Sequence, residues 1–134
     1  MAEVRTQRVT GELHVNFVKK AEECEALMRI ALEKEMHNAA VVLAVHCGIS
    51  AADALTVYFL GVRHAGTNHA DVQRLLTQIK DREMPQKVRH LAMLLAVKGF
   101  AEYEERLVTP ANAKDAVMHA ERFLAWAKEK LRTK

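Results

Sequence analysis

The apolar positions of this chain recur at spacings of three and four residues, which predicts helices. From about Gly11 to Met36 they form a single stripe, with charged residues on the other faces. The stripe consists of Leu13, Phe17, Ala21, Cys24, Met28 and Ala31. A second helix, from about Asn38 to Leu60, is apolar nearly all round. The first helix is therefore expected to bury one face, and the second to be the central helix of the fold.

Glycines give two further expectations for the second helix. Gly61 follows its last apolar residue and is predicted to end it in the left-handed conformation. Gly48 lies inside the helix and predicts a close approach of another helix. A loop, residues 62–67, is expected next. A short third helix should start near Asn68, which can cap it, with Asp71 reaching back.

Two prolines mark the helices that follow. Pro85 suits the first turn of a fourth helix, predicted to end near Val108, and Thr109-Pro110 reads as the cap and first residue of a fifth helix. Residues 1–10 are expected to be a loose, flexible tail, and residues 11–134 a single domain. The predicted fold class is all-α, an antiparallel bundle of four main helices plus one short helix.

Composition supports this fold class. Half of the 134 residues are apolar, and there are only two prolines and five glycines, which leaves little room for turn-rich β architecture. Cys24 and Cys47 are expected to be free thiols. The polar start MAEVRTQRVT lacks the apolar run of a signal peptide, which predicts a cytoplasmic protein. The longest stretch without charge, residues 36–52, is too short and too polar for a membrane span.

Net charge is +3, and the excess is not evenly spread. Residues 61–90 carry six Lys and Arg against three Asp and Glu, whereas residues 1–37 carry six against seven. This distribution favours an anionic partner near residues 61–90. A solvated face with a chance imbalance is the alternative.

Three polar residues share one face of the apolar second helix. His46, Ser50 and Asp53 are spaced i, i+4 and i+7. A buried carboxylate is costly unless it is paired, so Asp53 needs a partner, and the nearest candidates along the chain are Arg63 and His69. A bond from Asp53 to a neighbouring helix or loop, with no functional role, is the alternative.

The segment from Arg63 to His69 offers the chemistry of a small anion site. The guanidinium of Arg63 suits phosphate oxygens, and His69 is expected in the first turn of the third helix, where the helix dipole favours a neutral imidazole. A neutral His takes a proton from a ribose 2′-OH or, once charged, protonates the leaving oxygen, while a cation stabilises the phosphorane. These residues can therefore support RNA cleavage without a metal.

The sequence indicates no cofactor. It contains neither the E-x-x-H pairs of di-iron bundles nor an H-E-x-x-H motif. A metal site built from His46, His64 and His69 is an alternative use of these histidines. Tyr103 is expected either to pack at the edge of the bundle or to contact the site.

The same residues resemble the HEPN superfamily of small helical-bundle proteins. That family carries an R-x4–6-H motif between its second and third main helices, and Arg63-x5-His69 fits it. The preceding CGISAADALTVYFLG is similar to the small, Ala-rich helix that leads into the motif. AEYEERLV, followed by a last helix with AERFLAWA, is similar to the C-terminal half of bacterial members. The resemblance spans residues 11–128.

The resemblance implies a ribonuclease that is active as a homodimer, with Arg63 and His69 of both chains in one cleft and Asp53 orienting Arg63. Family members often act as toxins or in defence against phage, so a nucleotidyltransferase-like antitoxin is an expected partner. His64 departs from the Asn or Asp that many members have after the motif Arg, and it either replaces that residue or marks an altered site. The alternatives are a non-catalytic member that binds a nucleotide, RNA or protein, and a purely structural bundle.

Overall fold

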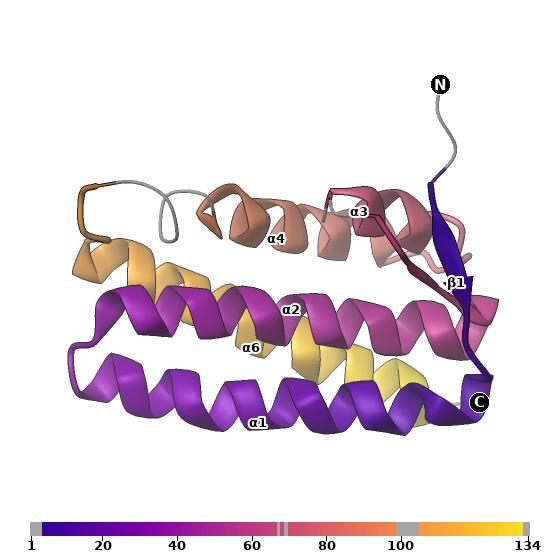
Figure 1. Ribbon diagram of the computed structural model, residues 1–134, viewed down its shortest axis with the longest axis horizontal. Helices are drawn as coiled ribbons and strands as arrows, with labels where there is room; N and C mark the ends of the chain where they lie inside the picture. Colours follow the sequence, from indigo (N-terminus) through magenta and orange to yellow (C-terminus); the bar gives the residue numbers. More distant parts are fainter. Residues whose placement is uncertain (1–3, 67, 69, 99–104, 133–134) are drawn as a thin grey trace.

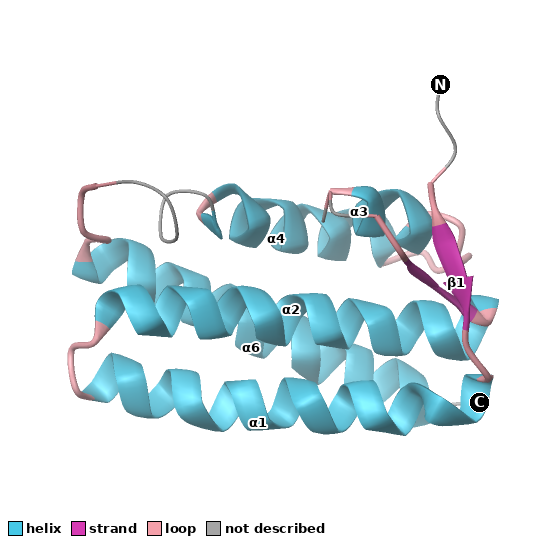
Figure 2. Ribbon diagram, in the orientation of Figure 1, coloured by secondary structure: helices cyan, strands magenta, loops and turns pink. Residues whose placement is uncertain are grey.

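The computed structural model describes residues 4–66, 68, 70–98 and 105–132. Within this part of the chain four long helices build the bundle (Figures 1 and 2), and α3 (Asp71–Leu76) is a short fifth one. The long helices are α1 (His14–Glu33), α2 (His37–Leu60), α4 (Met84–Ala96) and α6 (Pro110–Arg132). A 3-10 turn, Gly11–Leu13, leads into α1. The predicted all-α class of four main helices plus one short helix is confirmed.

Helix α2 is the centre of the bundle. It packs along α1 and α6, and α4 covers it from the remaining side (Figure 1). Fourteen of its residues are buried, including every residue from Ala51 to Val57. By length and composition alone α2 could cross a membrane, but 78% of its most apolar window is buried inside the protein. The helix therefore behaves as the core helix that the sequence predicted.

Gly48 lets α4 approach α2 closely. A Cβ built on Gly48 would lie 2.6 Å from Leu94 Cδ2 and 3.2 Å from Leu91 Cδ1, both of which belong to buried leucines of α4. These distances are shorter than ordinary van der Waals contact, so the missing side chain makes room for the two leucines. The close helix contact predicted from this glycine is confirmed.

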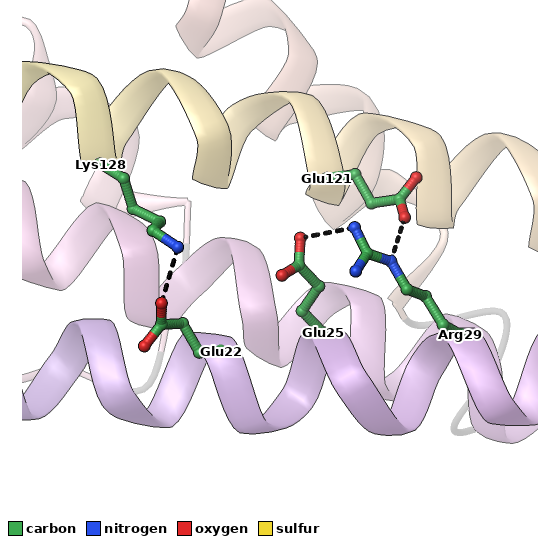
Figure 3. A network of polar contacts seen from close by, with 5 residues as sticks. All are labelled: Glu22, Glu25, Arg29, Glu121 and Lys128. Carbon is green, nitrogen blue, oxygen red and sulfur yellow. Dashed lines mark hydrogen bonds and ion pairs between the residues drawn. The ribbon is translucent and has the colours of Figure 1, made fainter.

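Ion pairs fasten α1 to α6 across the surface of the bundle (Figure 3). Arg29 of α1 donates from Nε to Glu121 of α6 at 2.5 Å and contacts Glu25 one turn earlier at 3.2 Å. Lys128 of α6 reaches Glu22 of α1 at 2.6 Å. These pairs set the mutual alignment of two helices that are far apart in the sequence, although exposed pairs add little stability.

Most helix ends follow the predicted signals, including Pro85 in the first turn of α4. Gly61 ends α2 with φ 71°, the left-handed conformation that glycine favours. Thr109 Oγ1 accepts a hydrogen bond from the Asn112 N–H at 3.1 Å and so caps α6. The fourth helix, however, ends at Ala96 instead of Val108, and residues 105–109 are not helical.

A two-stranded ribbon replaces part of the expected tail and loop. β1 (Thr6–Arg8) pairs antiparallel with β2 (Val62–His64), with Gln7 opposite Arg63. The ribbon continues on either side, where Val9 N–H donates to Gly61 O at 2.9 Å and Ala65 N–H donates to Arg5 O at 2.7 Å. Residues 6–8 are therefore not a loose tail. β1 and β2 are more than fifty residues apart in the sequence. The local pattern of apolar and polar residues does not reveal such a pairing.

A pair of histidines joins α4 to α6 on the opposite side of α2 from α1. His90 Nδ1 lies 3.0 Å from His119 Nδ1, so one ring nitrogen must donate and the other accept. Burial, followed by the positive charges of His119, Lys87, Arg122 and Arg89, lowers the pKa of His90 below its ordinary value of 6.5. Protonation of His90 is therefore disfavoured in the folded protein.

We expect Gly48→Val to destabilise the protein by roughly 1–3 kcal/mol, because the new side chain would overlap Leu94 in a packed core. Urea unfolding measures the change. His46→Val is the matched control, since it places the same β-branched residue at an exposed position of the same helix. Equal losses in both variants would assign the effect to helix propensity instead of packing.

The His90 pair predicts a pH dependence of stability. Because the folded pKa of His90 is lowered, the unfolded chain binds more protons below about pH 6.5, and the free energy of unfolding falls as the pH drops through this range. His90→Gln is expected to flatten the profile between about pH 7.5 and 5, measured by urea unfolding. His46→Gln, an exposed histidine on α2, should leave the profile unchanged. A profile unchanged by His90→Gln would refute the assignment.

Candidate functional site

Arg63 lies in the middle of β2, where the ribbon crosses the bundle next to the end of α2 and the start of α1 (Figure 1). Its side chain is 35% exposed, so the guanidinium has one buried side and one open side. On the buried side Nη2 lies 3.5 Å from Asp53 Oδ2. The guanidinium carbon also lies 5.3 Å from the centre of the Phe17 ring. A carboxylate and an aromatic ring of two different helices thus hold this arginine.

Asp53 supplies the buried negative charge of the site. It lies about two turns before the end of α2, and its side chain is only 4% exposed. Its two oxygens face different partners, Arg63 on Oδ2 and His64 on Oδ1, each at 3.5 Å. The sequence predicted that this carboxylate needs a partner and placed Arg63 among the candidates, and the structure brings the two together.

Both contacts of Asp53 are longer than good hydrogen bonds, which span about 2.7–3.2 Å. Within the described part of the chain, Asp53 Oδ1 and Arg63 Nε are buried and form no hydrogen bond. Charge attraction between buried groups therefore holds Asp53 and Arg63 together. Both side chains keep an atom that can still form a hydrogen bond. An arginine held in this way can turn toward an anion without breaking a short bond.

The other predicted site residues of α2 and β2 differ in how deeply they are buried. His64 is 4% exposed and packs against Asp53, whereas Ser50, one turn before Asp53, is half-buried and His46 is exposed. His46 is therefore surrounded by solvent, whereas His64 is surrounded by protein. Among the residues that the structure describes, no group of three or more His, Cys, Asp or Glu side chains is placed to hold a metal ion.

His69 and Tyr103 lie outside the described residues, so their positions relative to Arg63 stay predictions. The third helix begins at Asp71 instead of near Asn68. The Asn68 side chain accepts a hydrogen bond from the Ala70 N–H at 3.0 Å and so caps the turn that leads into α3, as the sequence predicted.

An open groove of about 500 Å³ lies beside the exposed side of Arg63, between α1 and β1. Lys20 reaches over its floor, with Nζ 5.2 Å from the centre of the same Phe17 ring. The lining includes Gln7, Leu13, Phe17, Lys19, Lys20 and Arg63. Phe17 is a buried core residue and Lys20 is exposed, as the sequence predicted, but the sequence did not indicate that both border one groove. The β-branched residues Val4, Thr6, Val9 and Thr10 were the available signal for the strand that forms one wall.

The fold and the anchored arginine define a small helical-bundle protein with a HEPN-like fold. A crystal structure of ST0689, an archaeal HEPN homologue, superposes with a TM-score of 0.69 over 89% of this chain and 98% of that one, at 21% sequence identity. No family model matches the sequence, and no curated protein matches it either. At this identity the likeness establishes the fold, and the activity has to be argued from the site.

We expect Asp53→Asn to destabilise the protein by roughly 1–3 kcal/mol, because it removes the counter-charge of a half-buried arginine while keeping the size of the side chain. Urea unfolding at neutral pH measures the change. Asp71→Asn is the control, since its contact to Arg74 is exposed and should be worth less than about 0.5 kcal/mol. A gain in stability in Asp53→Asn would show that desolvation of the carboxylate outweighs the pairing.

Proposed function

We propose that this protein is a metal-independent endoribonuclease of the HEPN type. One observation carries the proposal: Arg63, the first residue of the Arg63-x5-His69 motif, is held by a buried carboxylate with one side open to solvent, in a HEPN-like fold. A phosphate-binding arginine needs an anchor and an open side together.

The chemistry assigns a separate role to each residue. The guanidinium of Arg63 binds the scissile phosphate and stabilises the charge that builds up on its oxygens. His69 takes the proton from the 2′-OH, or returns one to the leaving 5′-oxygen, so that the chain breaks with a cyclic phosphate on one product. Asp53 is a positioning residue that keeps Arg63 beside the end of α2, and His64 packs on the other oxygen of the same carboxylate.

The active form in this proposal is a homodimer, in which the Arg63 and His69 residues of both chains line one cleft. A second histidine in the same cleft would let one imidazole act as base while the other acts as acid. The proposal places the protein in the cytoplasm, where RNA is available. Within this proposal, the biological role is that of a toxin or defence nuclease that a nucleotidyltransferase-like antitoxin inhibits.

A non-catalytic role is the second candidate, and His64 favours it. Many HEPN ribonucleases have Asn or Asp directly after the motif Arg, whereas here a buried His occupies that position against Asp53. In this case the same arginine would bind a nucleotide, an RNA or a partner protein without turnover. Thermal-shift screening identifies it through nucleotide stabilisation that Arg63→Ala removes.

Incubation of the purified protein with RNA and excess EDTA tests the proposed cleavage. We expect cleavage to survive chelation and to fall by roughly 10²–10⁴-fold in His69→Ala and 10²–10³-fold in Arg63→Ala. His46→Ala is the matched control, because it removes an exposed histidine of α2 and should keep the full rate.

Three results would contradict the nuclease. They are cleavage that needs added Mg²⁺, cleavage that persists in His69→Ala, and no cleavage of any of several RNAs by a folded dimer.

A further inference from the structure

The groove between α1 and β1 carries more positive than negative charge. Lys19, Lys20 and Arg63 line it, against the single carboxylate of Glu23. A second groove of about 450 Å³ lies next to it, with Arg8 on its wall, and both grooves are lined by Val9. Arg8 belongs to this second groove and faces away from Gln7 and Arg63, because neighbouring residues of a strand point to opposite faces of the ribbon. The positive charge beside Arg63 therefore comes from Lys19 and Lys20 of α1.

The Phe17 ring lies close to two cations of the first groove, Lys20 and Arg63. Lys20 Nζ and the guanidinium carbon of Arg63 both lie within 5.3 Å of the centre of the Phe17 ring. A cation near an aromatic ring is attracted to it, which lowers the freedom of two otherwise flexible side chains. The ring itself is 9% exposed and packs in the core, so it forms a rigid support. Two ordered positive charges consequently border the same groove.

The groove also offers an apolar surface. Leu13, on its wall, is 45% exposed, so the groove has an apolar side as well as charged ones. Charged groups and an exposed leucine along one open channel match a ligand that alternates anionic and flat apolar parts. Single-stranded nucleic acid has this character, because each nucleotide carries a phosphate and a base.

We propose that the α1–β1 groove is the binding track for a single strand of RNA. Lys20 and Lys19 bind backbone phosphates before the strand reaches Arg63. The proposal rests on the function proposed above for Arg63, and it adds a substrate path on a face of α1 that the motif does not include. The strand enters along α1 and passes its phosphates to the arginine anchored by Asp53.

Fluorescence anisotropy with a short labelled single-stranded RNA tests the track, in a His69→Ala background so that binding is measured without cleavage. The test variant is Lys19→Gln/Lys20→Gln. The matched control is Lys34→Gln/Lys114→Gln, which removes the same charge from exposed lysines at the C-terminal end of α1 and in the first turns of α6, at the far end of the bundle from β1 (Figure 1).

Loss of two phosphate contacts is expected to weaken binding roughly 25-fold at about 0.1 M salt. It should also lower the slope of log affinity against log salt by about 1.4, at about 0.7 per single-strand contact. Lys19→Arg/Lys20→Arg should keep both values, because the charge stays in place. The control pair should leave the slope unchanged. Circular dichroism confirms that each variant is folded.

Equal weakening by the test and control pairs would overturn the track, because it would show attraction by net charge alone. Absence of RNA binding would overturn it as well. Lysine-dependent binding of polyglutamate in place of RNA would identify an acidic protein partner instead and would also count against the track.

The two proposals fail separately. Lysine-dependent RNA binding without cleavage in the native chain would overturn the nuclease and support the track. Cleavage that does not change in Lys19→Gln/Lys20→Gln would support the nuclease and overturn the track.

Discussion

A carboxylate buried in the most apolar helix is the constraint on which the rest of the site depends. Asp53 lies within a run of seven buried residues, where a bare negative charge would cost several kcal/mol. The fold meets this cost by bringing β2 back across the end of α2, so that Arg63 and His64 face the two oxygens. The turn at Gly61 and the pairing of β1 with β2 hold these two partners beside Asp53. The candidate arginine is thus also the counter-charge of the buried carboxylate.

Helix patterns made most of the fold predictable. The uniform apolarity of α2, Gly48, Gly61 and the Thr109-Pro110 start of α6 are local signals, and the structure follows each of them. The stripe of α1 is followed from Phe17 to Ala31, but Leu13 at its start is exposed. The early end of α4 was missed because the apolar spacing looks continuous beyond Ala96. Periodicity alone therefore does not define the boundaries of an element.

The candidate site was predictable only in part. The charge cost of Asp53 pointed to Arg63 and His69 without any knowledge of the fold, and the structure confirms Arg63 as a partner. The contact with His64 was not among the predicted ones. The groove could not be derived in the same way. It depends on β1 pairing with a strand more than fifty residues away and on Phe17 meeting cations from two different elements. Long-range juxtapositions of this kind leave no periodic trace in the sequence.

The ribbon that presents Arg63 has only three residue pairs, whereas α1 and α2 pack along their whole lengths. So small a unit contributes few cooperative contacts, and units of this kind open at a lower free-energy cost than a helical core. The N-terminal strand is therefore expected to detach and re-form more readily than the helices, so the strand that pairs with Arg63 is less stable than the bundle that carries Asp53.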